Sequence, residues 1–276
     1  MARLAPHDLS LAASWLRSAR RVAVFTGAGI SAESGVATFR DAGGVWERFP
    51  ADEFGDLPGL LKVAATAPDR LVQYFVELLE PLAAATPNAG HLAVARLERY
   101  TQVSVITQNI DRLHQEAGST IVYEVHGSMF RIVTLTGREI RTLSRQDLRE
   151  IAERLRRIEE GYGRLPRFLA AVHPLLGVGL HGPYRPDVVM FGEAMAEPAW
   201  SRSVEAAASC DLMITVGTSG EVMPAAGLPH QASEHGARVI RVDPQPGFGD
   251  LWLPGPAASV LPALVAAAFD AGEKGG

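Results

Sequence analysis

Cysteine and lysine are scarce in this chain of 276 residues. It has one cysteine, Cys210, and two lysines, Lys62 and Lys274. A single cysteine excludes an internal disulfide framework and any metal site built from several thiolates. No apolar run approaches the roughly 18 residues that span a membrane, and a formal charge of −5 argues against nucleic acid as a specific partner. The apolar stretch 9–16 lacks a following cleavage site of small residues, so we interpret it as a first helix and expect a cytoplasmic protein.

Short apolar runs of strand length alternate with segments of helical periodicity along most of the chain. The strand candidates are residues 21–26, 101–107, 120–125, 211–216 and 237–242, and the helix candidates are residues 9–16, 68–84, 89–99, 197–209, 224–235 and 257–270. With 47% hydrophobic residues, the chain can bury a substantial core. This alternation predicts an α/β fold with a Rossmann-like, doubly wound parallel sheet.

Residues 128–184 interrupt the alternation. They contain ten arginines and a charged helix candidate at 147–161. Glutamates are interleaved with these arginines, which indicates a solvated helix face rather than a nucleic-acid-binding surface. We therefore expect a large domain formed by residues 1–127 and 185–276, with a small inserted, mainly helical domain at 128–184.

A glycine-rich segment follows the first strand candidate. Gly27, Gly29 and Ala32 match the G-x-G-x-x-G/A spacing, in which glycines let backbone N–H groups approach a pyrophosphate. The match alone also fits an ordinary tight turn. A dehydrogenase would place a helix, a second strand and an acidic residue within about 30 residues, but Gly35 interrupts the segment and Asp243 comes far later. We therefore expect a nucleotide site without hydride transfer.

Polar side chains follow the ends of two neighbouring strand candidates. Gln108, Asn109 and Asp111 follow the first of them, and His126 follows the second. Ligands of open α/β sheets bind at the carboxyl ends of the strands. A single histidine after a strand is more often structural than catalytic, but here it accompanies amides, a carboxylate and a glycine loop. This combination predicts a cofactor site that contains its own general base.

Six segments resemble, in order and rough spacing, those of the sirtuins, which are NAD-dependent protein deacylases. They read GAGISAESGVATFR, PNAGHLAVARLE, TQNIDRLH, EVHGS, RPDVVMFGE and GTSGEVMPAA. The resemblance implies a Rossmann-like large domain, a small domain, and a cleft that binds NAD and an acyl-lysine protein or peptide. It therefore implies an NAD-dependent protein-lysine deacylase.

The resemblance also implies a role for individual residues. The implied cofactor-binding set is Gly27, Ala28, Gly29, Ser31, Phe39, Arg40, Gln108, Asn109, Asp111, Gly217, Thr218, Ser219 and Asp243. The implied substrate-binding set is Tyr74, Val189, Phe191, Gly192, Glu221 and Val222. The implied catalytic residues are His126 and Asn109. His91 and His114 also lie in matching segments, and we interpret them as hydrogen-bonded structural residues.

The implied reaction requires neither a metal nor a protein nucleophile. The acyl oxygen of the modified lysine displaces nicotinamide from C1′ of the ribose, and His126 takes a proton from a ribose hydroxyl. The products are nicotinamide, O-acyl-ADP-ribose and free lysine. The peptide is expected to add as a strand between segments 191–193 and 220–222, with affinity from backbone pairing.

The inserted segment departs from most sirtuins, which bind a structural zinc ion there through two Cys-x-x-Cys pairs. The aligned positions hold Thr134 and Gly137, then His173 and Leu176. One imidazole cannot form a four-coordinate site, so we predict that no zinc is bound. NAD is then the only cofactor that we expect. Since structural zinc supplies folding free energy, we expect a small apolar core to replace it and to pack on the large domain. Its predicted members are Ile151, Leu155, Ile158, Leu165, Phe168, Leu169 and Val172.

Three further positions bear on specificity. Sirtuins that remove succinyl or malonyl groups carry a tyrosine and, three residues on, an arginine, whereas the corresponding helix here has Tyr74 and Glu77. A glutamate repels an acidic acyl group, so we expect a neutral acyl substrate, although Thr38, where many deacetylases have aspartate, favours the opposite preference. Asp243 stands where the family usually has asparagine, and its carboxylate can still accept bonds from ribose hydroxyls.

Two other functions fit the same segments. The first is NAD-dependent ADP-ribosyl transfer or NAD glycohydrolysis, because the same C1′ carbon can react with another nucleophile. The intact His126 favours deacylation over this alternative. The second is a non-catalytic NAD or ADP-ribose sensor that binds a partner through its arginine-rich segment. That function would better suit a chain without His126 or Asn109.

Overall fold

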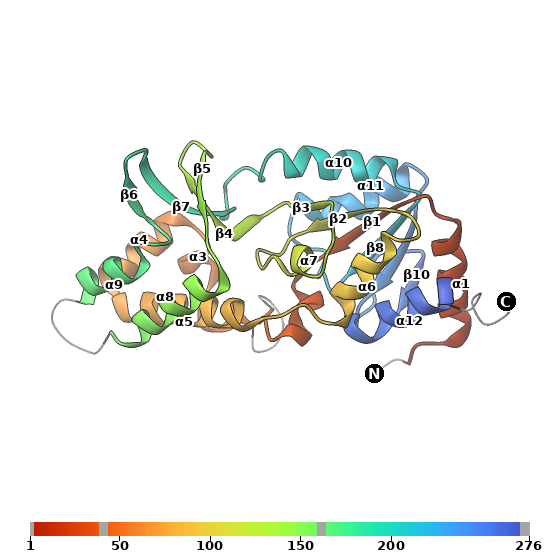
Figure 1. Ribbon diagram of the computed structural model, residues 1–276, viewed down its shortest axis with the longest axis horizontal. Helices are drawn as coiled ribbons and strands as arrows, with labels where there is room; N and C mark the ends of the chain where they lie inside the picture. The colour runs from red at the N-terminus through yellow and green to blue at the C-terminus, as the bar shows by residue number, and fades with distance from the viewer. Residues whose placement is uncertain (1–2, 39–43, 159–163, 271–276) are drawn as a thin grey trace. The chain divides into compact units, whose positions relative to one another are not determined.

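The computed structural model describes residues 3–38, 44–158 and 164–270, which form two compact units (Figure 1). Unit 1 comprises Met1–Ser34, Thr86–Val125 and Glu197–Gly276, and unit 2 comprises Gly35–Ala85 and His126–Ala196. Unit 2 therefore includes residues 35–85, which we expected in the large domain. The compact units and the predicted domains differ in this segment and also at residues 126–127 and 185–196, which belong to unit 2 but were expected in the large domain.

Unit 1 is built on a six-stranded parallel sheet with the strand order β10-β9-β8-β1-β2-β3. The strands are β1 (Arg21–Thr26), β2 (Gln102–Thr107), β3 (Val122–Glu124), β8 (Leu212–Val216), β9 (Arg238–Val242) and β10 (Leu251–Leu253). The chain proceeds outward from β1 in both directions, which confirms the predicted doubly wound sheet. The edge strand β10 was not predicted, because three residues are too few to display a period.

Helices cover both faces of this sheet (Figure 1). They are α1 (Pro6–Ser18), α6 (Ala89–Leu97), α7 (Leu113–Glu116), α10 (Ala199–Ser209), α11 (Leu228–Glu234) and α12 (Ala257–Phe269), with short 3₁₀ helices η1 (Ala28–Ile30), η2 (Ala32–Ser34) and η3 (Ala225–Gly227). Alternate strand residues such as Val22 and Val24 join α1, α6 and α12 in one buried core. The helices α10 and α11 lie on the opposite face. No helix among the described residues is long and apolar enough to cross a membrane.

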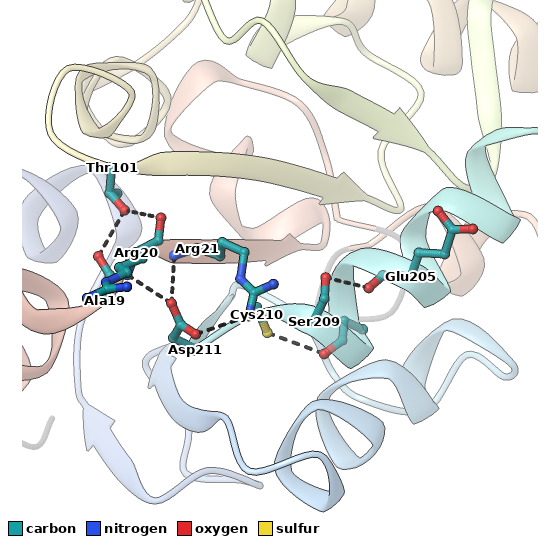
Figure 2. A network of polar contacts seen from close by, with 9 residues as sticks. Ala19, Arg20, Arg21, Thr101, Glu205, Ser209, Cys210 and Asp211 are labelled. Carbon is teal, nitrogen blue, oxygen red and sulfur yellow. Dashed lines mark hydrogen bonds and ion pairs between the residues drawn. The ribbon is translucent and has the colours of Figure 1, made fainter.

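Polar contacts close the amino ends of β1, β2 and β8 (Figure 2). Asp211 Oδ2 accepts the backbone N–H groups of Arg20 and Arg21, each at 2.9 Å. These bonds, led by the one from Arg21, hold the pKa of the Asp211 carboxyl below its ordinary value. The Thr101 hydroxyl bonds to the carbonyl oxygens of Ala19 at 2.9 Å and of Arg20 at 2.8 Å. The amino edge of the sheet is thus held by structural contacts, and the polar site residues predicted above follow the carboxyl ends.

Unit 2 combines an antiparallel sheet with helices. The sheet has the order β5-β4-β7-β6, and its strands are β4 (Gly127–Thr134), β5 (Glu139–Thr142), β6 (Gly177–Gly179) and β7 (Gly182–Val188). The helices are α2 (Val45–Arg48), α3 (Ala51–Phe54), α4 (Leu57–Thr66), α5 (Pro68–Ala84), α8 (Arg145–Arg156) and α9 (Arg164–Val172). The inserted segment contains the predicted charged helix as α8 and a second helix, α9, but its sheet was not predicted. Glycine, proline and charged residues interrupt β5, β6 and β7, so no alternating pattern marks them.

The apolar core predicted in the inserted segment forms in part. Its buried members are Ile151, Leu155, Phe168 and Val172. They pack on α5, where the rings of Phe75 and Phe168 have centroids 5.6 Å apart. The prediction is wrong for Leu169, which is 51% exposed, because successive helical residues point about 100° apart and Phe168 takes the buried direction. Ile158 is half-buried, and the side chain of Leu165 lies outside the described part of the chain.

Candidate functional site

Two glycine-containing loops meet at the carboxyl ends of β1 and β8. The Gly29 N–H donates to the Gly217 carbonyl at 2.9 Å. A Cβ atom added at Gly27 would lie 2.7 Å from the Gly217 oxygen, and one added at Gly29 would lie 2.6 Å from the Gly217 Cα. Gly217 itself has φ +56°. The two loops can therefore pack this closely only because glycine occupies these positions.

Ser31 connects the first glycine loop with the polar residues that follow β2. Its hydroxyl donates to Asp111 Oδ2 at 2.7 Å and accepts the side-chain amide N–H of Asn109 at 3.1 Å. The other carboxylate oxygen of Asp111 accepts the Leu113 N–H at 2.9 Å. Ser31, Asn109 and Asp111 are all buried. The structure thus places three residues of the implied cofactor-binding set in one hydrogen-bonded group.

Two buried histidines adjoin this group, with ring centroids 4.9 Å apart. His91 Nδ1 accepts the Asn88 N–H at 3.4 Å, so in the neutral ring Nε2 carries the proton and faces the Ser31 hydroxyl at 3.4 Å. Burial lowers the pKa of His91 to about 4. Burial, together with the neighbouring His91, lowers the pKa of His114 to about 3. Both rings are therefore neutral at pH 7 and are hydrogen-bonded within the fold.

Two threonines join β1 to β2 beside these histidines. The Thr26 hydroxyl donates to Thr107 Oγ1 at 2.8 Å, and the same Thr107 oxygen accepts the Asn109 N–H at 3.1 Å. Because the Thr26 proton is used in this bond, His114 Nε2 is the donor to Thr26 Oγ1, at 3.0 Å. Sequence reasoning missed both threonines as site residues. The available signal was that each one ends an apolar strand candidate.

The remaining members of the implied cofactor set follow the strands β1, β2, β8 and β9. The Thr218 hydroxyl donates to Gln108 Oε1 at 3.2 Å, which joins the loops after β8 and β2. Asp243 follows β9 and forms an ion pair with Arg241 at 3.2 Å. Arg241 was missed, although an arginine inside an apolar strand candidate indicates a paired charge. Ala28 begins η1 and Ser219 follows Thr218, whereas Phe39 and Arg40 lie outside the described residues.

His126 lies between the end of β3 and the start of β4, and it is half-buried. Its carbonyl accepts the Val189 N–H at 2.9 Å. The next residue, Gly127, has φ +74°, and a Cβ there would lie 1.7 Å from the Asp187 carbonyl oxygen. Only glycine fits at that position, so the His-Gly pair in the sequence has a structural cause. It fixes the backbone on which the His126 side chain is carried.

The implied substrate-binding residues lie in both units, and each is described within its own. In unit 2 the Phe191 N–H donates to the Gly55 carbonyl at 3.0 Å, and 46% of Phe191 is exposed. Gly192 follows with φ +84°. Tyr74 is buried, and this burial raises its pKa to about 12. The aromatic rings packed around Tyr74 are those of Phe49, Phe54 and Phe75. In unit 1, Glu221 and Val222 belong to the loop after β8.

No group of three or more His, Cys, Asp or Glu side chains within the described residues is arranged to hold a metal ion. At the positions aligned with zinc ligands, the Thr134 hydroxyl bonds to that of Thr136 at 2.9 Å, and His173 Nε2 lies 3.2 Å from the Tyr184 hydroxyl. Cys210 lies in unit 1, where burial raises the pKa of its thiol to about 11.

Comparisons with known proteins agree with this arrangement. The Sir2 family model matches residues 27–224. An NAD-dependent protein deacylase of Desulfosudis oleivorans is 45% identical over 266 residues, which cover 92% of this chain and 93% of that protein. A structure solved in work on the mechanism and regulation of Sir2 enzymes aligns with a TM-score of 0.76 and 32% identity, over 97% of this chain and 100% of that one. A Sir2 homologue in complex with NAD aligns with a TM-score of 0.74 and 27% identity, over 98% and 97% of the two chains. This chain therefore belongs to the Sir2 family.

Proposed function

We propose that this protein is an NAD-dependent protein-lysine deacylase that releases nicotinamide, O-acyl-ADP-ribose and free lysine. The observation that carries the proposal is the buried group of Ser31, Asn109 and Asp111, which lies beside the two glycine-containing loops after β1 and β8. Family membership and the activity named for a relative with 45% identity support the same function.

The residues present fit NAD. At Gly27, Gly29 and Gly217 an added Cβ would meet backbone atoms at 2.7 Å or less, so these glycines let the two loops lie close together at the edge where the phosphates would bind. Thr218 and Ser219 would contribute hydroxyl groups to the phosphates. When bound, NAD supplies a ribose carbon from which nicotinamide can leave.

The side chains at the end of β2 would hold the nicotinamide and its ribose. Ser31 fixes the orientation of both Asn109 and Asp111 through the bonds described above. Asn109 and Asp111 would then contact the nicotinamide, and Gln108 would contact the ribose. His126 is assigned as the general base that takes a proton from a ribose hydroxyl. This assignment requires a neutral imidazole at the working pH.

The test is deacylation of an acetyl-lysine peptide with NAD by the wild-type protein and by His126→Ala. Removing a general base is expected to lower the rate by roughly 100-fold or more. His181→Ala is the matched control, since His181 is an exposed residue of unit 2. Equal rates for wild type and His126→Ala would contradict the mechanism. Release of free ADP-ribose in place of O-acyl-ADP-ribose would instead identify a glycohydrolase.

We further propose that the acyl group removed is neutral. Glu77 carries a carboxylate that pairs with Arg48 at 2.6 Å, so the position three residues after Tyr74 does not present a cation to an acidic acyl group. Acetyl and myristoyl peptides are expected to react faster than a succinyl peptide of the same sequence. A preference for the succinyl peptide, measured as a higher kcat/KM, would contradict this assignment.

We also propose that unit 2 is stabilised without zinc. The whole chain has a single cysteine, and the four aligned ligand positions contain one imidazole. The buried apolar contacts of α8 and α9 with α5 support this proposal, because they supply a core in the segment that zinc stabilises in most relatives.

A further inference from the structure

An ion pair closes a loop of unit 2 at the end of β7. Arg185 Nη2, on β7, lies 2.8 Å from Oε2 of Glu193, eight residues further along the chain. Between them the chain turns at Gly192, which has φ +84°. Because the two side chains are only 31% and 35% exposed, solvent screens the pair incompletely. We call residues 185–193 the Arg-Glu loop, since this pair joins its two ends.

Each member of the pair also bonds to a backbone group inside the loop. The same Glu193 oxygen accepts the Met190 N–H at 3.0 Å, and Arg185 Nη1 donates to the Val188 carbonyl at 3.4 Å. Hydrogen bonds in which one partner is ionised are the stronger ones. The two side chains therefore hold the backbone in the middle of the Arg-Glu loop as well as its ends.

Two other N–H groups of the Arg-Glu loop bond to the rest of unit 2. The Val189 N–H donates to the His126 carbonyl at 2.9 Å, and the Phe191 N–H donates to the Gly55 carbonyl at 3.0 Å. These bonds anchor the loop in its unit. Within the described residues the Gly192 N–H has no such partner, so this peptide group can pair with an added strand.

We propose that Arg185 and Glu193 are positioning residues for the acyl-lysine peptide. Their ion pair sets the backbone of the Arg-Glu loop before the peptide arrives, so the peptide adds to a preformed strand edge. Ordering a loop during binding costs affinity, and a loop that is already ordered avoids that cost. The inference rests on the proposed deacylase function and adds to it two residues that act through the loop backbone.

The proposal predicts a specific kinetic effect. Glu193→Gln removes the charge and leaves a side chain of the same length. Without the ion pair the peptide has to order the loop, so KM for an acetyl-lysine peptide is expected to rise about tenfold, equivalent to about 1.4 kcal/mol. At saturating NAD, kcat is expected to stay unchanged, because the loss concerns binding alone. Calorimetry should likewise give an unchanged dissociation constant for ADP-ribose.

The matched control is Glu80→Gln. Glu80 belongs to α5 and pairs with Arg156 of α8, and its side chain is 34% exposed, against 35% for Glu193. The control therefore removes an equally exposed carboxylate from an ion pair of the same unit, outside the Arg-Glu loop. Its peptide KM is expected to equal that of the wild type. An equal rise of KM in both variants, or a fall of kcat as the only effect of Glu193→Gln, would overturn the proposal.

A double-mutant cycle tests whether the two residues act as one pair. Arg185→Gln is expected to raise the peptide KM as Glu193→Gln does, and the combined variant should raise it no further. KM increases that multiply would overturn the proposal. Arg185→Lys keeps the cation but not the bond to Val188, so its KM should lie between those of the wild type and Arg185→Gln.

The remaining outcomes separate the inference from the proposed function. If a glutamine variant fails to fold, Arg185→Lys provides the test, and a wild-type peptide KM in that variant would overturn the inference. A folded Glu193→Gln with the wild-type peptide KM would also overturn the inference, while the proposed function would stand. Wild-type protein that deacylates no peptide would overturn the proposed function itself.

Discussion

The hydroxyl of Ser31 takes part in three contacts at once. It donates to Asp111, accepts from Asn109, and lies 3.4 Å from His91 Nε2. Since the hydroxyl has one proton and two lone pairs, these contacts use its full hydrogen-bonding capacity. The positions of the amide and the carboxylate therefore depend on this one side chain.

Replacing this hydroxyl is expected to impair the reaction more than the fold. Ser31→Ala removes a hydrogen bond to a carboxylate, worth about 1.5–3 kcal/mol, so kcat/KM for NAD should fall roughly 10- to 100-fold. Steady-state kinetics at varied NAD concentration would measure this. The control is Ser34→Ala, which removes a hydroxyl that bonds to Asn88 at 3.0 Å in the same segment. Comparable losses in the two variants would contradict the assigned role.

The buried histidines predict how stability depends on pH. Burial lowers the pKa of His91 from 6.5 to about 4 and that of His114 from 6.5 to about 3. At each histidine, the unfolded chain therefore binds a proton more readily than the folded protein does between pH 6.5 and the lowered pKa of that histidine. The contribution of the neutral rings is fully present above pH 6.5 and is lost as the pH falls towards 4 for His91 and towards 3 for His114.

The free energy of unfolding is accordingly expected to fall between pH 7 and pH 5, by about 2 kcal/mol for each histidine. Urea unfolding at several pH values would measure the decrease. His181→Ala, at an exposed position, should leave the slope unchanged, whereas His114→Gln should reduce it. A wild-type protein equally stable at both pH values would show that these rings are not buried as neutral groups.

At the scale of elements, α8 closes the carboxyl end of α5. Arg145 donates to the Leu82 carbonyl, and Arg149 Nη2 donates to the Ala83 carbonyl at 3.3 Å. The last carbonyl groups of a helix have no partner within it, so these arginines provide a C-terminal cap. Arg145 also lies over the Phe130 ring, with its guanidinium carbon 5.1 Å from the centroid. The arginine-rich helix thus has a structural face towards α5 in addition to its solvated one.

Removing this cap is expected to destabilise the protein. Arg145→Met loses the carbonyl bond and the contact with the ring, which together should lower the free energy of unfolding by about 1–2 kcal/mol. Arg154→Met on the same helix removes only an exposed pair with Glu150 at 3.6 Å and should cost less than about 0.5 kcal/mol. Chemical unfolding of both variants would compare them. A cost for Arg154→Met equal to that for Arg145→Met would argue against the cap.

Some elements and some site residues could be predicted from the sequence, and others could not. The helices α5 and α10 and the strands β1 and β8 match the predicted segments closely, because their buried faces impose a clear period on the sequence. The strands β5 to β7 follow no such period. Asn109 and Asp111 could be placed at a strand end from their position alone. Their contacts with Ser31 could not, since those depend on how β1 and β2 pair.

At the scale of the whole molecule, two units of different design make up one chain. Unit 1 has a parallel sheet covered by helices on both faces, and unit 2 has an antiparallel sheet with an apolar core between α5, α8 and α9. Each unit contains residues that the proposed reaction requires. Activity therefore requires that unit 2 is stably folded. The interactions that stabilise unit 2 can be tested.

A chelator is expected to leave both stability and activity unchanged. Because the structural proposal assigns the folding free energy of unit 2 to apolar packing and helix capping, removing metal ions should not shift the melting temperature. Thermal unfolding and deacylation would be measured before and after dialysis against EDTA, with a zinc-binding relative as the positive control. A melting temperature that falls with EDTA and recovers with zinc would contradict the proposal.

The burial of Cys210 has a practical consequence for labelling. A thiol with a pKa of about 11 is protonated at neutral pH, and maleimides react with the thiolate. The natural protein should therefore give almost no background with such dyes. A cysteine introduced at an exposed position in each unit would carry the only reactive thiols, so fluorescence energy transfer could report the distance between the units in solution without removal of any native residue.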